Sequence, residues 1–181
     1  MGTLDHDRVA SRFGEVVEAV ADWDSPTPVP EWINRDIVHH LTTWFPEFLA
    51  SGGITISAGR RDDPVGSWHI QATAVAELLA TRGAESFTHP HVGTRSVAET
   101  VAMFYTPDVF MHTWDLARAS GLDDRLDDET CAELLATMAE MGNVIRASGQ
   151  FGVQRPVSTD ADAQTQLLAF IGRDPGWRPP S

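Results

Sequence analysis

The stretch DVFMHTWDLARASG, residues 108–121, combines apolar and ionisable side chains at helical spacing. At about 100° per residue, Val109 and Leu116 lie on one apolar arc of a helix, and His112 falls inside that arc. Asp108 lies one turn before His112 on the same face. The segment therefore predicts a helix whose buried face carries an imidazole beside a carboxylate.

The rest of the chain continues this helical pattern. A capping box, S-V-A-E at 96–99, opens the helix that holds the stretch, and Gly121 ends it. The spacing of apolar residues predicts helices over 5–23, 33–51, 67–82, 96–120, 127–147 and 160–171. Residues 54–66 are predicted as a polar loop, and residues 86–95 as either a loop or a short hairpin. Together these elements predict an all-α helical bundle, in a single domain over residues 1–181 with an additional short C-terminal helix.

Composition excludes several classes of function. Among the 181 residues, 26 are Asp or Glu and 13 are Lys or Arg, which gives a net charge of −13 at pH 7. Such a chain repels phosphate backbones and anionic lipids, so we expect neither nucleic acid nor a membrane as a partner. All the basic residues are arginines, which excludes a catalytic or phosphate-binding lysine. The single cysteine, Cys131, excludes an intrachain disulfide and a cysteine-rich zinc site.

The apolar runs and the N-terminal segment indicate a location in the cell. No apolar run approaches the ~18 residues of a transmembrane helix. The acidic, amphipathic segment at residues 1–20 does not resemble a signal peptide. We therefore expect a cytoplasmic protein.

A pair of histidines, His39 and His40, lies on the helix predicted over residues 33–51. Ile37 and Trp44 belong to its apolar arc. His40 falls at the edge of that arc, and His39 falls on the opposite side, toward solvent. An acid and an imidazole four residues apart converge on one point above a helix, and a histidine on a facing helix would complete a two-His, one-carboxylate set. Such a set holds a divalent metal with open coordination positions for water or substrate.

Other interpretations of these side chains stay open from spacing alone. Asp36 precedes His40 by four residues, so that pair is an equally good one by spacing. Asp36 and Asp108 could each instead stabilise the first turn of a helix, where a carboxylate faces the positive end of the dipole. Pro46 and Pro107 each lie inside a predicted helix, which they either bend or divide into two short helices.

The remaining reactive side chains have weaker patterns. His69, His89 and His91 could line a cleft, although the short H-P-H pair favours a solvated loop over a metal motif. Cys131 lies in the first turn of its predicted helix, where a thiol pKa can be lowered. Because no histidine adjoins Cys131 in the sequence, we interpret it as an inert core residue.

Three segments resemble a known family. W-I-N-R-D-I-V-H-H-L, residues 32–41, is similar to the Trp-x-x-(Arg)-(Asp)-hydrophobic-x-x-His-Leu segment of the DinB-like bundle proteins, also known as DinB/YfiT-like. Residues 108–121 resemble the acid-x-x-x-His-x-(Trp)-Asp-Leu-Ala-x-Ala-x-Gly segment of the mycothiol-dependent maleylpyruvate isomerases of actinobacteria. Residues 151–152 and 160–175 resemble the short-form, single-domain members of that group.

The resemblance implies a DinB-like four-helix bundle that binds a divalent metal. The implied ligands are His40 on the second helix, with Asp108 and His112 on a later helix. This set takes His40 over His39, and Asp108 over Asp36. Zinc is the metal that we expect, and the same ligands suit nickel and ferrous iron. Well-studied isomerases of the group carry Glu at the position of Asp108 and have an additional C-terminal domain.

Asp115, three residues after His112, has two interpretations of equal weight. In the first, its carboxylate accepts a hydrogen bond and so orients either a metal ligand or a nearby arginine such as Arg35. It could instead form a buried ion pair that joins two helices.

Two main hypotheses for function follow. The first is an enzyme whose metal activates a low-molecular-weight thiol, mycothiol by the resemblance, or water, for S-transfer to a small electrophile or for its isomerisation. The second is a metal- or ligand-binding bundle without catalysis, suggested by Asp108 in place of Glu and by the missing C-terminal domain. A helical interaction module without metal is a third, weaker hypothesis. An isologous homodimer is the default assembly for such a bundle.

Overall fold

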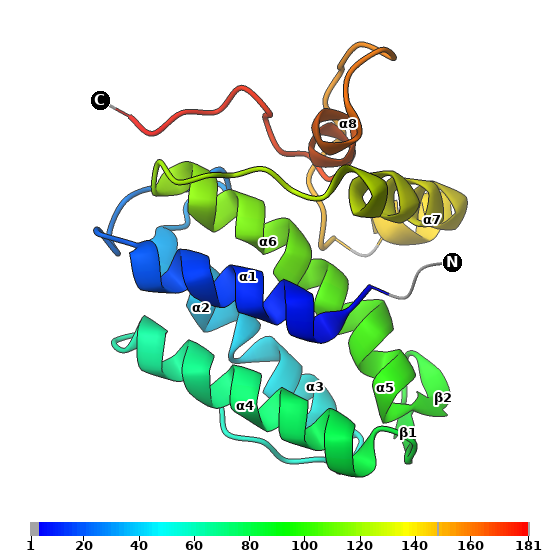
Figure 1. The fold of residues 1–181 in the computed structure, drawn as a ribbon. Helices are drawn as coiled ribbons and strands as arrows, with labels where there is room; N and C mark the ends of the chain where they lie inside the picture. Colours follow the sequence, from blue (N-terminus) through cyan, green and yellow to red (C-terminus); the bar gives the residue numbers. More distant parts are fainter. Residues whose placement is uncertain (1–3, 148, 181) are drawn as a thin grey trace.

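The computed structural model describes residues 4–147 and 149–180, apart from the side chains of residues 143–147. Figure 1 shows a mostly helical molecule with one small pair of strands at its edge. In chain order the elements are α1 (His6–Ala19), α2 (Asn34–Leu41), α3 (Trp44–Ser51), α4 (Pro64–Arg82), β1 (Ser86–His89), β2 (Gly93–Ser96), α5 (Val97–Thr100), the π-helical turn η1 (Val101–Tyr105), α6 (Thr106–Ala119), α7 (Asp128–Ala147) and α8 (Ala163–Phe170). Within the described residues, no helix is long and apolar enough to cross a bilayer.

Helices α1, α2, α4 and α6 enclose the main core. α1 packs against both α4 and α6, and α2 packs against the same two helices. Phe13, Leu41, Trp68 and Trp114 are among the fully or almost fully buried side chains that fill the space between them. The rings of Phe13 and Trp68 meet edge to face, with centroids 4.5 Å apart. Burial of this apolar surface brings α2 and α6 side by side, and the ionisable residues of both helices with them.

The helix predicted over residues 33–51 is divided into α2 and α3. The hydroxyls of Thr42 and Thr43 donate to carbonyl oxygens of the preceding turn, at 2.8 and 2.6 Å. Such local bonds compete with the hydrogen-bond ladder of a helix. Pro46 therefore lies in the first turn of α3, where the N–H that proline lacks has no helical partner to lose.

The helix predicted over residues 96–120 is interrupted by η1, one π-helical turn between α5 and α6. The Thr106 hydroxyl donates to the carbonyl oxygen of Val101 at 3.1 Å across this wider turn. Pro107 follows in the first turn of α6, a position that tolerates proline. Isolated π-helical turns occur frequently at functional sites, and the residue after Pro107 is Asp108.

Strands β1 and β2 correct the all-α expectation. They pair antiparallel, with Phe87 opposite Arg95, so residues 86–95 contain the hairpin rather than a plain loop. Phe87 anchors the hairpin because its side chain is buried against Gly52, where any side chain would collide with the Phe87 ring. The fold is thus mostly helical with a small two-stranded sheet.

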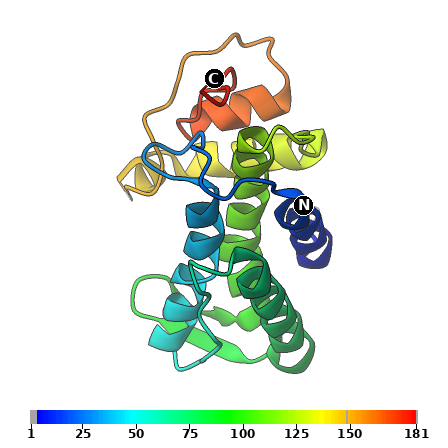
Figure 2. The ribbon, with the colours of Figure 1, turned by 90° about the vertical axis from the view of Figure 1, so that its left-hand side faces the viewer.

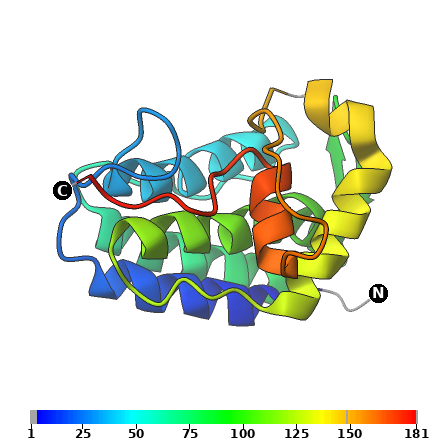
Figure 3. The ribbon, with the colours of Figure 1, turned by 90° about the horizontal axis from the view of Figure 1, so that it is seen from above.

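The C-terminal part of the chain packs on one side of the core helices. Figure 2 shows α7 at the upper end of α6 with α8 above it, and α8 packs directly against α7. The Asp162 carboxylate caps α8 by accepting from the Thr165 N–H at 2.7 Å, so the helix predicted over 160–171 begins three residues later. After α8, the chain runs along α6 on the side of α2 (Figure 3).

We expect Phe13→Ala to lower the free energy of unfolding by about 3–5 kcal/mol, because the truncation leaves a cavity beside Trp68. Urea unfolding followed by tryptophan fluorescence measures the change. Ile70→Ala is the matched control on the outer face of α4, where Ile70 is 56% exposed. The control should change stability by about 0.5 kcal/mol or less. A Phe13→Ala loss as small as that of the control would contradict this description of the core.

Candidate metal centre

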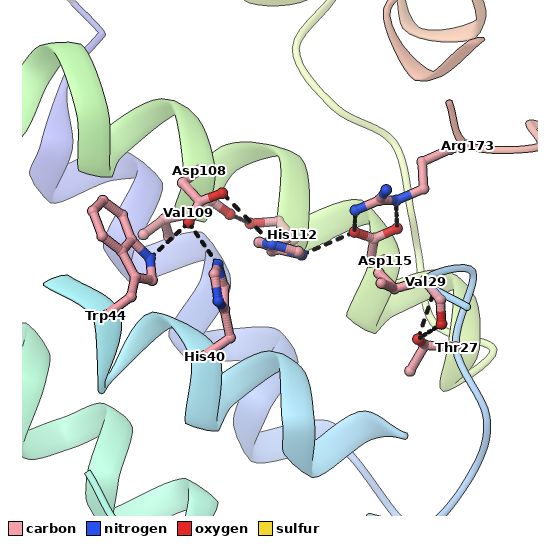
Figure 4. A network of polar contacts seen from close by, with 10 residues as sticks. Thr27, Val29, His40, Trp44, Asp108, Val109, His112, Asp115 and Arg173 are labelled. Atoms are coloured by element: carbon pink, nitrogen blue, oxygen red, sulfur yellow. Dashed lines mark hydrogen bonds and ion pairs between the residues drawn. The ribbon is translucent and has the colours of Figure 1, made fainter. Parts of the chain in front are cut away.

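His40, Asp108 and His112 converge between α2 and α6. One ligand atom from each of the three residues lies within 4.8 Å of the other two. His40 Nε2 is 3.1 Å from Asp108 Oδ2, and His112 Nε2 is 3.6 Å from Asp108 Oδ1. Figure 4 shows both imidazoles turned toward the Asp108 carboxylate. The structure thus brings together the three residues that the sequence and the resemblance selected.

Secondary structure explains why the three side chains meet. Asp108 and His112 are one turn apart on α6, so they share the face that packs on α2. His40 lies in the last turn of α2, just before the helix ends at Thr42. Asp108 also lies in the first turn of α6, where the helix dipole favours a negative charge. The two interpretations of Asp108, a helix-end acid and a member of the site, are therefore compatible.

The surroundings of Asp108 favour its ionised form. Burial alone would raise its pKa, but the imidazoles of His112 and His40 and the Trp44 N–H outweigh burial, and the pKa lies below its ordinary value. Trp44 Nε1 donates to Asp108 Oδ2 at 2.9 Å and so fixes the orientation of the carboxylate. The result is an oriented anion, 22% exposed, that faces two imidazole nitrogens.

Asp115 holds the other side of the His112 ring. Its Oδ2 lies 2.9 Å from His112 Nδ1. Burial would raise the pKa of Asp115, but the Arg173 guanidinium and His112 together outweigh burial, and the pKa lies below its ordinary value. The carboxylate is therefore ionised and can only accept hydrogen bonds. His112 Nδ1 must therefore carry the donated hydrogen. In the neutral imidazole this leaves the lone pair on Nε2, the atom that faces Asp108.

The arginine beside Asp115 is Arg173, which corrects the expectation of Arg35. Arg173 binds both carboxylate oxygens of Asp115, through Nε at 2.8 Å and through its terminal nitrogen at 3.0 Å. Arg35 instead pairs with the exposed carboxylate of Asp24 at 2.8 Å. Asp115 thus makes both a hydrogen bond to His112 and a buried ion pair, although the pair joins α6 to the segment after α8 rather than to a second helix.

The alternative residues on α2 have other roles. Asp36 accepts from the Ile33 N–H at 3.1 Å as a helix cap, and it pairs with Arg61 at 2.6 Å. It therefore does not share a site with His40. His39 is partly buried, whereas the sequence predicted that it faces solvent. Neither residue belongs to the group formed by His40, Asp108 and His112.

The histidines outside α2 and α6 form no second candidate metal site within the described residues. His69 pairs on the surface with Glu18 at 3.0 Å. His89 stacks on Phe48 with ring centroids 4.3 Å apart, and His91 lies 5.6 Å from His89. Both rings of the H-P-H pair therefore lie against aromatic neighbours.

Trp32 packs against both imidazoles of the candidate centre, a contact that the sequence did not reveal. Its ring stacks on His112 at 5.8 Å between centroids and lies 5.1 Å from the His40 ring. The preceding residue, Glu31, has a φ of 67°, in the left-handed region that residues other than glycine rarely adopt. A strained turn at Glu31 therefore accompanies the placement of an indole that stacks on His112 and contacts His40.

Comparisons with known proteins identify the family. A family model described as the mycothiol maleylpyruvate isomerase N-terminal domain matches residues 6–89. The chain belongs to this family. The family is part of the DinB-like superfamily. His40 lies within the matched residues, whereas Asp108 and His112 follow them.

Similarity to two Mycobacterium tuberculosis proteins extends over almost the whole chain. They are the uncharacterized protein MT0763 of strain CDC 1551 / Oshkosh and the uncharacterized protein Rv0738 of strain ATCC 25618 / H37Rv. Each is 31% identical over 173 residues, which cover 93% of this chain and 95% of the relative. No solved structure matches the chain.

We expect Cys131 to resist alkylation in the folded protein. It is fully buried, and burial together with the carboxylates of Asp128 and Asp127 raises its pKa to about 12. At pH 8 such a thiol is protonated, and only the thiolate reacts. Labelling with a chromogenic disulfide at pH 8 should be slower in buffer than in urea by about 100-fold or more. Fast labelling of the folded chain would refute the interpretation of Cys131 as an inert core residue.

Proposed function

We propose that this protein binds one divalent metal ion through His40 Nε2, Asp108 and His112 Nε2. The observation that carries the proposal is the convergence of these three ligand atoms within 4.8 Å. Tetrahedral zinc with ligands at about 2.0–2.2 Å separates its ligand atoms by roughly 3.3 Å. The separations are 3.1 Å from His40 Nε2 to Asp108 Oδ2 and 3.6 Å from His112 Nε2 to Asp108 Oδ1, and all three ligand atoms lie within 4.8 Å of one another, so the side chains would draw closer together around the ion.

Zinc is the proposed metal, with nickel and ferrous iron as the alternatives that this ligand set suits. Three protein ligands would leave coordination positions open, as in catalytic rather than structural zinc sites. When bound, a divalent metal in such a site lowers the pKa of a coordinated thiol or water. Family membership favours a low-molecular-weight thiol, mycothiol, as the partner of the site.

We further propose that the protein is an enzyme that transfers this thiol to a small electrophile or uses it for isomerisation. The chain's own residues would prepare the site for such chemistry. Asp115 holds the Nδ1 hydrogen of His112, and Trp44 holds the Asp108 carboxylate. Trp32 would exclude water from one side of the centre, because its ring stacks on His112.

The alternative is a bundle that binds a metal or ligand without catalysis. Asp108 Oδ2 already accepts from both His40 and Trp44, and the side chain is shorter than the Glu of the well-studied isomerases. This restricts how far the carboxylate can move as a reaction proceeds. The two functions differ in turnover and agree in metal binding, so experiments can separate them.

We also propose an architecture for the whole chain. The mutual packing of α1, α2, α4 and α6 supports a DinB-like four-helix bundle. The packing of α8 on α7 and the contacts of Arg173 with α6 support one domain over residues 1–181. An isologous homodimer stays the expected assembly.

We expect about one zinc per chain in wild-type protein and none in a His40→Ala, His112→Ala double variant. Two of the three ligands would then be missing. Mass spectrometry of tag-free protein measures the metal content. His69→Ala is the matched control, because His69 contacts only the surface residue Glu18 among the described ion pairs. Wild-type protein that stays metal-free after loading with zinc, nickel and ferrous iron would overturn the proposed site.

We expect metal removal to abolish thiol transfer. Zinc-loaded protein should accelerate the reaction of mycothiol with at least one member of a panel of small electrophiles. Chelation should return the rate to background, and zinc should restore it. The measurement is thiol consumption and product formation by chromatography. Metal binding at full occupancy with no acceleration across a broad panel would favour the non-catalytic alternative.

A further inference from the structure

We propose that Arg173 is a positioning residue of the metal centre, acting through Asp115 to hold His112 with Nε2 toward the metal. The inference deepens the proposed function and rests on it. It assigns to the C-terminal segment, defined as residues 171–177, a part in metal binding. That segment lies outside the residues that the family model matches.

The contacts form one continuous chain. Arg173 binds Asp115 with two parallel hydrogen bonds of 2.8 and 3.0 Å, the bidentate geometry in which a guanidinium fits a carboxylate best. Asp115 in turn accepts from His112 Nδ1 at 2.9 Å. The Asp115 side chain is fully buried, and the Arg173 side chain is 14% exposed. Figure 4 shows the three groups in a row that ends at Asp108.

The local structure of the C-terminal segment fixes where Arg173 lies. Gly172 has a φ of 86°, and a Cβ there would come within 2.6 Å of the Gly152 backbone. The Gly152 N–H donates to the Ile171 carbonyl at 3.2 Å. The Arg173 N–H donates to the carbonyl oxygen of Leu168 at 2.9 Å, at the end of α8. The close approach of two glycines thus places the next residue directly over α6.

Loss of the guanidinium would disturb His112 rather than only loosen the tail. Without Arg173, Asp115 would be a buried carboxylate with no cation, which is strongly unfavourable. The carboxylate would then turn away from His112, and the hydrogen bond that holds the Nδ1 hydrogen and the orientation of the ring would be lost. An imidazole without a fixed tautomer offers Nε2 to a metal less often.

The same coupling must act in reverse. If Arg173 strengthens metal binding, then metal binding strengthens the docking of Arg173 by the same factor, since linkage is reciprocal. The Arg173 amide, which donates to Leu168, reports on that docking through its hydrogen exchange. A purely structural ion pair between α6 and the tail would not respond to a metal.

The test is zinc affinity, measured by competition between apo-protein and a chromophoric chelator. Arg173→Gln should weaken zinc binding by about 10–100-fold, the usual effect of losing a partner that orients a ligand. Arg155→Gln is the matched control. Arg155 holds the same segment by donating from Nε to the Gly172 carbonyl at 3.1 Å, but its bonds are to backbone oxygen rather than to Asp115. We expect the control to change affinity less than about 2-fold.

Arg173→Lys keeps the charge and loses the bidentate geometry, so its affinity should lie between those of the control and Arg173→Gln. If Arg173→Gln does not fold, as shown by loss of its helical circular dichroism, the zinc affinity of Arg173→Lys tests the proposal in its place. Cobalt-loaded protein gives a second readout. If the visible spectrum of bound cobalt changes in the Arg173 variants but not in Arg155→Gln, the coordination by His112 has changed. Zinc should also slow exchange of the Arg173 amide in wild-type protein and not in Asp115→Asn.

The outcomes separate this inference from the proposed function. Wild-type protein that binds neither zinc nor cobalt removes the proposed function, and the inference with it. Wild-type binding together with equal affinities and spectra for the Arg173 and Arg155 variants overturns the inference alone. A selective loss in the Arg173 variants supports it.

Discussion

Two carboxylates on the buried side of α6 constrain the rest of the structure. Asp115 is fully buried, and Asp108 is 22% exposed. An ionised group in such surroundings is strongly destabilising unless donors and cations replace the water that it has lost. α2 supplies His40 to Asp108, and the C-terminal segment supplies Arg173 to Asp115. Stable folding of α6 therefore requires that segments distant in the sequence dock on it.

The range of each interaction explains how much of the site the sequence could predict. Asp108 and His112 are neighbours through helical period alone, so their pairing follows from local sequence. The choice of His40 needed its place on the apolar arc and the resemblance to the isomerases. Arg173 is 58 residues from Asp115, on a tail without periodicity, so no local pattern could pair them. The one available signal was indirect, since a carboxylate on an apolar face requires a cation from elsewhere.

The details of the fold that the sequence left open depend on contacts that the helical period does not report. The break between α2 and α3 depends on bonds from the Thr42 and Thr43 hydroxyls to backbone, which no apolar period reveals. The hairpin depends on Phe87, whose burial against Gly52 is a tertiary contact. The helical period predicts where apolar surface must face inward, and so it predicted the main helices well. Hydrogen bonds from side chains to the nearby backbone, and tertiary contacts with residues distant in the sequence, then determine where each element begins and ends.

The balance of charge at the proposed centre indicates which ligand it favours. Asp108 and Asp115 carry two negative charges and Arg173 one positive charge, while the imidazoles are neutral as metal ligands. The site alone is therefore negative by one unit, which attracts a cation. A divalent metal would reverse the sign to one positive charge beside the Trp32 ring. A thiolate would neutralise that charge and a neutral thiol would not, so the electrostatics of the site favour a substrate that binds by losing its proton.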